Sequence, residues 1–197
     1  MSVFFANLLV NKMIINDVID CGKREEYIYT LQLLIEKLIG IVLVYVFALS
    51  IGKIVETTLF FITYSTVRKY SGGFHCRTEA GCLIASIGFV IFSILIEAPL
   101  LLEHKIVTNI IYLFAVCFIL IVGPINHPNM NWSKKEYKRS KKTSSRIVLL
   151  FSILLILSEL IGLPIRTTIF IRIGMINAIA LIVLAKITKQ EVKQHEQ

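Results

Sequence analysis

The chain has 197 residues, of which 56% are hydrophobic and 17% are charged, and its formal net charge is +8. A soluble domain carries about 45–50% apolar and about 25% charged residues, so this composition, with a mean hydropathy of +0.76, excludes an ordinary soluble protein. Because Lys and Arg of membrane proteins gather in cytoplasmic loops, the positive charge indicates topology. No nucleic-acid-binding motif accompanies it, and we expect no nucleic-acid partner.

Residues 1–30 predict an amphipathic N-terminal segment, in which apolar residues such as Phe4 and Leu8 are interrupted by Asn7 and Asn11. A helix with this pattern can lie in the membrane interface. It can equally be an ordinary helix that packs on a neighbour, and the sequence leaves both interpretations open.

The rest of the chain predicts about six transmembrane helices, since about 20 apolar residues cross a bilayer as a helix. Four segments meet or approach this length directly, and two shorter ones complete the set, with 57–67 the weakest: 82–102, 106–125, 147–165, 167–185, 38–52 and 57–67. The predicted fold class is all-α, a polytopic membrane helix bundle forming a single membrane domain over residues 1–197.

The distribution of positive charge predicts the orientation. With six spans, 17 of the 21 Lys and Arg residues fall on the side of the two termini and of the loops 68–82 and 126–146. This bias places those segments in the cytoplasm. Within the spans, Glu159 and Arg172 occur at matching depth on consecutive antiparallel helices, which predicts an ion pair, and Glu97 is assigned to structure.

The loop 68–82 concentrates glycine, histidine and cysteine at one membrane boundary. Cys82 begins an apolar span, where the unpaired N–H groups and positive dipole of a helix start favour a thiolate. An N–H group such as that of Leu83 could hold an oxyanion. These features make Cys82 a candidate nucleophile, although a cysteine in this place is often only a small apolar residue.

His75 is the candidate general base. Seven residues separate it from Cys82, about 10 Å along a straight helix, so the segment must bend if the two side chains are to meet. Gly72, Gly73 and Gly81 supply that freedom. Cys76 remains a second candidate nucleophile, and the ordinary interpretation of His75 is a solvated loop residue.

A metal site is disfavoured, because three ligands at most are present and two of them, His75 and Cys76, are adjacent. We therefore expect no metal and no cofactor. The sequence offers no third member of a triad beyond the solvated Glu79, so the prediction is a Cys–His dyad.

Several of these residues together resemble the accessory gene regulator B family of bacterial membrane endopeptidases. The resemblance rests on Arg68, on the spacing of Gly73, His75 and Cys82, on the Gly-Pro-Ile-Asn-His-Pro turn at 123–128, and on the basic loop that follows. It implies a plasma-membrane cysteine endopeptidase with Cys82 as nucleophile and His75 as base, with Arg68, Gly72 and Gly73 shaping the site.

The resemblance also implies the substrate, a short AgrD-like propeptide of a quorum-sensing autoinducer. Its C-terminal tail would leave as a Cys82 thioester forms, and an internal nucleophile of the peptide would then close the ring. A homodimer is a further expectation of the resemblance.

The loop 126–146 carries a basic stretch, which anchors topology on anionic lipid or docks the acidic tail of the propeptide: Lys134, Lys135, Lys138, Arg139, Lys141 and Lys142. Two other classes of function stay open. One is a small non-catalytic peptide transporter or channel that uses the charges within the spans, and the other is a non-enzymatic membrane anchor.

Overall fold

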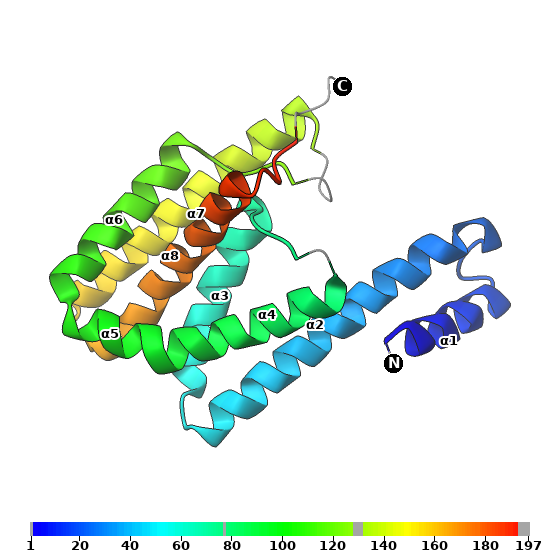
Figure 1. Ribbon diagram of the computed structural model, residues 1–197, viewed down its shortest axis with the longest axis horizontal. Coiled ribbons are helices and arrows are strands. Elements are labelled where there is room, and N and C mark those ends of the chain that lie inside the picture. Colours follow the sequence, from blue (N-terminus) through cyan, green and yellow to red (C-terminus); the bar gives the residue numbers. More distant parts are fainter. Residues whose placement is uncertain (1, 77, 128–131, 193–197) are drawn as a thin grey trace. The chain divides into compact units, whose positions relative to one another are not determined.

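In the computed structural model, residues 2–76, 78–127 and 132–192 are described, apart from the side chain of Glu79. The regular elements of this described part are all helices (Figure 1): α1 (Ser2–Ile15), η1 (Cys21–Lys23), α2 (Arg24–Ser50), α3 (Ile54–Ser71), α4 (Glu79–Phe92), η2 (Ser93–Glu97), α5 (Ala98–Glu103), α6 (Lys105–Ile121), α7 (Lys134–Leu160) and α8 (Ile165–Ile187). The predicted all-α membrane bundle is confirmed.

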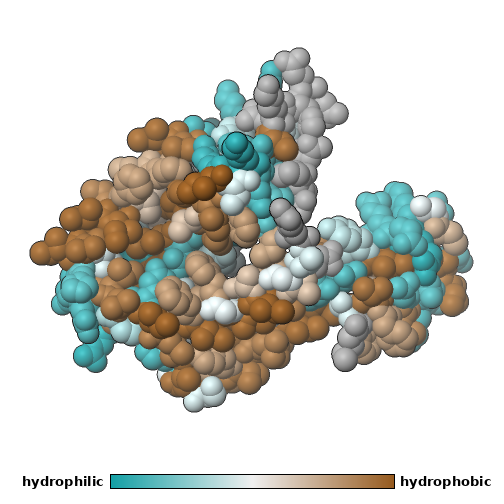
Figure 2. Space-filling model, viewed as in Figure 1, coloured by the Kyte–Doolittle hydropathy of each residue, from teal (hydrophilic) through white to brown (hydrophobic). Residues whose placement is uncertain are grey.

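The chain divides into two compact units. The first comprises Met1–Gly52 and Cys76–Val90, and the second comprises Lys53–His75 and Ile91–Gln197. Large apolar side chains are exposed along the helices, as in Leu34, Ile110 and Ile156. On the face drawn in Figure 2 the apolar residues follow the sides of the helices, while hydrophilic residues gather at the turns. An exposed apolar surface of this extent fits a lipid environment.

Among the residues that the structure describes, four helical segments are long and apolar enough to cross a membrane: Cys21–Ser50, Ala80–Glu103, Lys134–Leu160 and Ile165–Ile187. Two of the six predicted spans fall outside this set. Helix α6 is apolar but has 17 residues, and α3 has 18 residues with Glu56, Arg68 and Lys69 in its terminal turns.

Helix α3 tolerates its lower hydropathy because its polar side chains face protein. It packs on α8 and α7, and Thr57, Thr63 and Ser71 are buried. Thr57 and Thr63 donate to carbonyls one turn earlier in their own helix, Lys53 O and Leu59 O. Small polar residues at a helix interface allow such close packing in membranes.

Gly174 on α8 marks how near α3 comes. A Cβ added there would lie 2.9 Å from the carbonyl oxygen of Phe60 and 3.0 Å from Thr63 Cβ. Helix α8 is therefore the central helix of the second unit, and most of its side chains are buried.

Polar groups within the spans of the second unit pair with one another. Glu159 on α7 forms an ion pair with Arg172 on α8, which confirms the predicted pair. Asn177 Nδ2 donates to Glu97 at 2.7 Å and to Ser93 Oγ at 2.8 Å. Charges within a membrane normally pair in this way.

The residues around Glu97 form a π-helical turn. The Ala98 N–H donates to the carbonyl of Ser93, five residues earlier, and Pro99 has no N–H with which to continue the α-helical pattern. The wider turn carries Ser93 and Glu97, the two residues to which Asn177 donates.

The N-terminal segment predicted over 1–30 is two elements. Helix α1 packs on α2 through Ala6, Val10 and Ile28, and the membrane-crossing helix begins near residue 24, earlier than predicted. The face of α1 away from this contact is apolar and exposed, as at Phe4 and Leu8. Helix α1 therefore packs on its neighbour α2, and its exposed apolar face remains available for contact with lipid.

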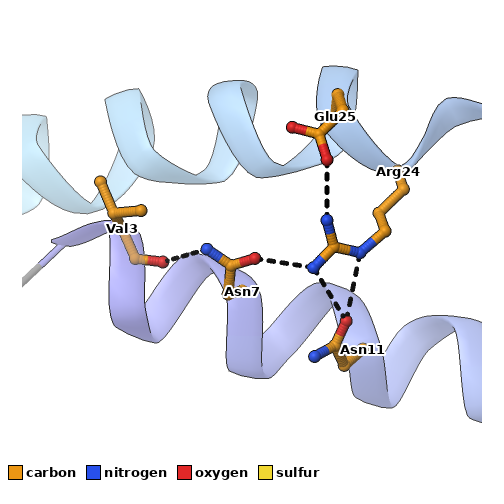
Figure 3. Close-up of polar contacts among 5 residues, drawn as sticks. All are labelled: Val3, Asn7, Asn11, Arg24 and Glu25. Atoms are coloured by element: carbon orange, nitrogen blue, oxygen red, sulfur yellow. Dashed lines mark hydrogen bonds and ion pairs between the residues drawn. The ribbon is translucent and has the colours of Figure 1, made fainter.

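Polar residues of α1 bind the start of α2 (Figure 3). The Arg24 guanidinium donates to Asn7 Oδ1 at 2.8 Å and to Asn11 Oδ1 at 3.4 Å, and it pairs with Glu25 at 2.7 Å. The asparagines that interrupt the apolar pattern of α1 therefore help to attach it to α2.

Candidate active site

An extended segment, residues 72–76, follows the end of α3 and carries the candidate base. Gly72 has φ +67 and ends the helix, a backbone conformation that favours glycine. Arg68, in the last turn of α3, folds over this segment. Its guanidinium donates to the carbonyl of Gly72 at 3.1 Å and to the carbonyl of Phe74.

Gly73 makes that position of Arg68 accessible. It has φ +129, and a Cβ added there would lie 2.0 Å from Arg68 Nη1 and 3.3 Å from the main chain of Leu181. Any side chain would displace the guanidinium. Two of the three residues predicted to shape the site, Arg68 and Gly73, thus depend on each other, whereas their part in a reaction remains a prediction.

The end of α8 and the chain after it hold His75 by its main chain. Phe74 N donates to Leu181 O at 2.9 Å. Gln190 Oε1 accepts from His75 N at 3.0 Å, and Gln190 Nε2 donates to His75 O at 2.8 Å. The Gln190 side chain therefore satisfies both main-chain polar groups of His75, and α8 satisfies the N–H group of Phe74.

The His75 ring faces a second histidine, His127, with 4.6 Å between ring centroids and a tilt of 49°. Burial, and after it the charges of Arg68 and His127, lower the pKa of His75 from 6.5 to about 4. Burial and Arg68 also lower the pKa of His127, and a hydrogen bond with the Gln190 side chain acts in the opposite direction. Both rings are thus neutral at neutral pH, and a neutral imidazole can accept a proton.

His127 belongs to the turn at 123–128, of which Pro128 lies outside the described residues. Ile125 N donates to Ser71 O and Val192 N to Asn126 O, both at 2.9 Å. Asn126 is fully buried and also accepts from Trp132 N at 2.8 Å. These bonds tie the turn to the end of α3 and to the C-terminal segment.

The candidate nucleophile occupies the first unit, near the start of α4. Thr78 Oγ1 accepts from Gly81 N at 3.2 Å, a side-chain cap of the helix. A Cβ at Gly81 would lie 2.7 Å from that oxygen, so glycine permits the cap. In the sequence Gly81 suggested a bend; in the structure it is helical.

Cys82 lies four residues after the cap, because its own N–H already donates to Thr78 O at 3.0 Å. Leu83 is one residue further inside the helix, where N–H groups bond to the preceding turn. The proposed oxyanion donor Leu83 is therefore wrong. The unpaired donors of a helix belong to its first turn, here Glu79 and Ala80.

Of the two residues of the predicted dyad, His75 belongs to the second unit and Cys82 to the first. The pairing of their side chains stays a prediction. Cys76 and Cys82 are both half-buried free thiols, and Cys76 Cβ is 3.8 Å from the position of a Cβ at Gly81. Both cysteines thus lie near the start of α4, and the choice between them stays open.

The basic stretch is helical from Lys134 onward rather than a loop. Ser133 caps α7 and Glu136 closes the capping box, the pattern typical of a helix start. Five of the six predicted tail-binding residues are exposed: Lys134, Lys135, Lys138, Arg139 and Lys142. Lys141 differs, because its Nζ donates to Ile121 O at 3.1 Å at the end of α6 and its stem packs at Gly123.

No group of three or more His, Cys, Asp or Glu with a metal-binding arrangement occurs among the described residues. Two polar residues at the site were not selected from the sequence. His127 belongs to the Gly-Pro-Ile-Asn-His-Pro turn at 123–128, and this motif is the signal that could have identified it as a site residue. Gln190 has no local signal, since its partner is 115 positions away.

Comparison with known proteins identifies the family. The model of accessory gene regulator B matches residues 5–189. The chain is 27% identical over 158 residues to an AgrB-like protein of Clostridium perfringens (strain SM101 / Type A), covering 76% of this chain and 74% of the relative. It is 28% identical over 145 residues to AgrB-like protein 2 of Clostridium perfringens (strain 13 / Type A), covering 70% and 68%.

No solved structure matches this chain. The family match extends over nearly the whole length, including α3, the loop before α4 and the end of α8. The helical bundle described above agrees with it. The chain therefore belongs to the accessory gene regulator B family of membrane proteins, which act in the processing of quorum-sensing peptides.

Proposed function

We propose that this protein is a cysteine endopeptidase of the bacterial plasma membrane that removes the C-terminal tail of a short AgrD-like propeptide. The observation that best supports this is the way His75 is held. Gln190 binds both main-chain polar groups of His75, and the His75 ring lies beside that of His127. The lowered pKa of His75 leaves the imidazole neutral at neutral pH, the form that can accept a proton.

The proposed reaction begins when His75 removes the proton of the Cys82 thiol. The thiolate attacks the carbonyl carbon of the scissile peptide bond, and the C–N bond breaks as the tail leaves with the proton from His75. The peptide remains as a thioester on Cys82. Attack by an internal Cys or Ser of the peptide closes the ring and restores the Cys82 thiol.

The start of α4 supports Cys82 as the nucleophile. The positive end of the helix dipole stabilises a thiolate, and the N–H groups of Glu79 and Ala80 lie in its first turn. Those two groups replace Leu83 as the proposed donors to an oxyanion.

The exposed part of the basic stretch is the proposed dock for an acidic peptide tail, with anionic lipid as its second partner. We place this site, the catalytic loop and both termini in the cytoplasm, according to the distribution of Lys and Arg. A homodimer is part of the same proposal.

The test is co-expression with a propeptide of known sequence, followed by mass spectrometry of the peptide and of the protein. The wild type should release the tail and carry a peptide adduct on Cys82, and the Cys82→Ala variant should do neither. If Cys82→Ala processes as well as the wild type while Cys76→Ala does not, Cys76 replaces it as nucleophile.

If neither cysteine matters, the peptidase proposal fails. The non-catalytic peptide transporter then becomes the leading hypothesis. The pairs within the spans, Glu159 with Arg172 and Asn177 with Glu97, would then be the residues to vary.

A further inference from the structure

The side chain of Gln190 contacts two histidines at once. Its amide accepts from His75 N at 3.0 Å and donates to His75 O at 2.8 Å, and it also hydrogen-bonds with the His127 side chain. Both main-chain polar groups of His75 are therefore satisfied by a single residue that is distant in the sequence.

The end of α8 orients Gln190 for these contacts. Lys189 has φ +55. Gln190 N donates to Ala185 O at 2.9 Å and Lys189 N to Lys186 O at 3.1 Å. These two bonds form a Schellman motif, in which a left-handed residue stops the helix and turns the chain. The turn brings the Gln190 amide to the extended segment.

The opposite side of that segment is held by Arg68, through the carbonyls of Gly72 and Phe74. The main chain is thus held at Gly72, Phe74 and His75. The His75 ring can then move only by rotation about its own side-chain bonds. Its neighbour His127 is 94% buried and is fixed by the same amide. The main chain of His75 is thus held by Gln190, a residue far from it in the sequence.

We propose that Gln190, on the chain just after α8, is a positioning residue for His75. This inference rests on the proposed function, in which His75 is the general base. Gln190 does not itself contact the reacting atoms in this proposal. It fixes the place and the surroundings of the group that moves the proton.

The proposal predicts a large effect on rate, because displacing a catalytic group by about 1 Å can cost about 100-fold. For Gln190→Ala we expect kcat to fall about 10- to 100-fold with KM little changed. Lys189→Gly is the matched control. Lys189 is exposed, and glycine accepts its positive φ, so the turn is kept and kcat should match the wild type.

Gln190→Glu gives a readout that a purely structural role would not change. It keeps an acceptor for His75 N but adds a negative charge beside both imidazoles. A negative charge favours the imidazolium and raises the pKa of His75. Because the base works only when neutral, the acidic limb of kcat/KM should move to higher pH.

The experiment uses the full chain in lipid nanodiscs. Diethyl pyrocarbonate, which reacts with neutral imidazole, is applied across a pH series, and modification of His75 is separated from that of His127 by peptide mass spectrometry. This measurement needs no substrate. Processing of the propeptide is measured in parallel, and circular dichroism checks that each variant is helical.

Three results together would support the proposal. His75 is modified faster in Gln190→Ala, the pKa of His75 read from the modification series is higher in Gln190→Glu, and kcat of Gln190→Ala falls. Unchanged modification in both variants would overturn it. A changed modification profile with unchanged kcat would also overturn it, because the contacts of Gln190 with His75 would then not serve catalysis. If neither Cys82→Ala nor Cys76→Ala lowers processing, it is the peptidase proposal that fails, whatever the modification of His75 shows.

Discussion

The two halves of the proposed dyad are held in different ways. Cys82 depends on contacts within a few residues, namely the cap from Thr78 to Gly81 and the bond from its own N–H to Thr78 O. His75 depends on a residue 115 positions away and on a turn from another connection. The nucleophile is thus placed by local helix chemistry, whereas the base is placed by tertiary contacts.

This contrast suggests how each half tolerates change. A helix start is recovered whenever its capping residues are present. A clamp built from distant segments is lost if any one of them moves. Substitutions far away in the sequence should therefore disturb the position of His75 more than the position of Cys82.

The largest effect should come from removing the nucleophile itself. For Cys82→Ala we expect processing to fall about a thousandfold or more, because the variant lacks the thiol that forms the proposed thioester. Peptide release followed by mass spectrometry measures it. Cys76→Ala is the matched control. If it loses processing while Cys82→Ala does not, the nucleophile is Cys76 in the extended segment.

A large effect is also expected from Gly73→Ala. The new Cβ would lie 2.0 Å from Arg68 Nη1, at a φ of +129, so the guanidinium must leave the carbonyls of Gly72 and Phe74. We expect about a 100-fold loss of kcat/KM and a lower thermal unfolding temperature.

Gly88→Ala on α4 is the control for Gly73→Ala. A Cβ there meets nothing within 4 Å, and Ala is about 0.5–1 kcal/mol better than Gly inside a helix. Its stability should be equal or higher and its activity unchanged. If Gly73→Ala behaves like Gly88→Ala, the Arg68 contact has no part in the site.

The pH dependence of kcat/KM tests how His75, the proposed base, is held. The pKa of His75 is lowered from 6.5 to about 4, first by burial and then by Arg68 and His127. Because the neutral form is the base, kcat/KM should stay level as pH falls from 8 to about 5 and decline only near pH 4. A decline centred near 6.5 would show that His75 is solvated in the working enzyme.

A smaller effect is expected in the basic stretch, where two lysines three positions apart should differ. Lys138→Gln removes an exposed charge and should raise KM for a propeptide with an acidic tail a few-fold, less so at high salt. Lys141→Gln removes the bond to Ile121 O and should mainly lower thermal stability. Equal effects of both on KM would assign the whole stretch to docking.

Several features of the fold and site followed from the sequence because they depend on local pattern. Long apolar runs predict membrane helices, and charges at equal depth predicted the pair of Glu159 and Arg172, which the structure confirms. The least certain span, α3, could not be judged by hydropathy, since its threonines and serine are sheltered by α8 and α7. The basic stretch was predicted as a loop because its charges hide the helical pattern that Ser133 begins.

The sequence by itself determined that this is an all-α membrane protein of the accessory gene regulator B family, with cysteine and histidine gathered before an apolar helix. Those conclusions rest on composition and on residues close together in the chain. The tertiary structure decided that Leu83 is inside the helix, that Lys141 closes the end of α6, and that Gln190 and His127 surround His75. Such facts depend on which distant main-chain groups meet, and hydrogen-bond partners 115 positions apart leave no trace in local pattern.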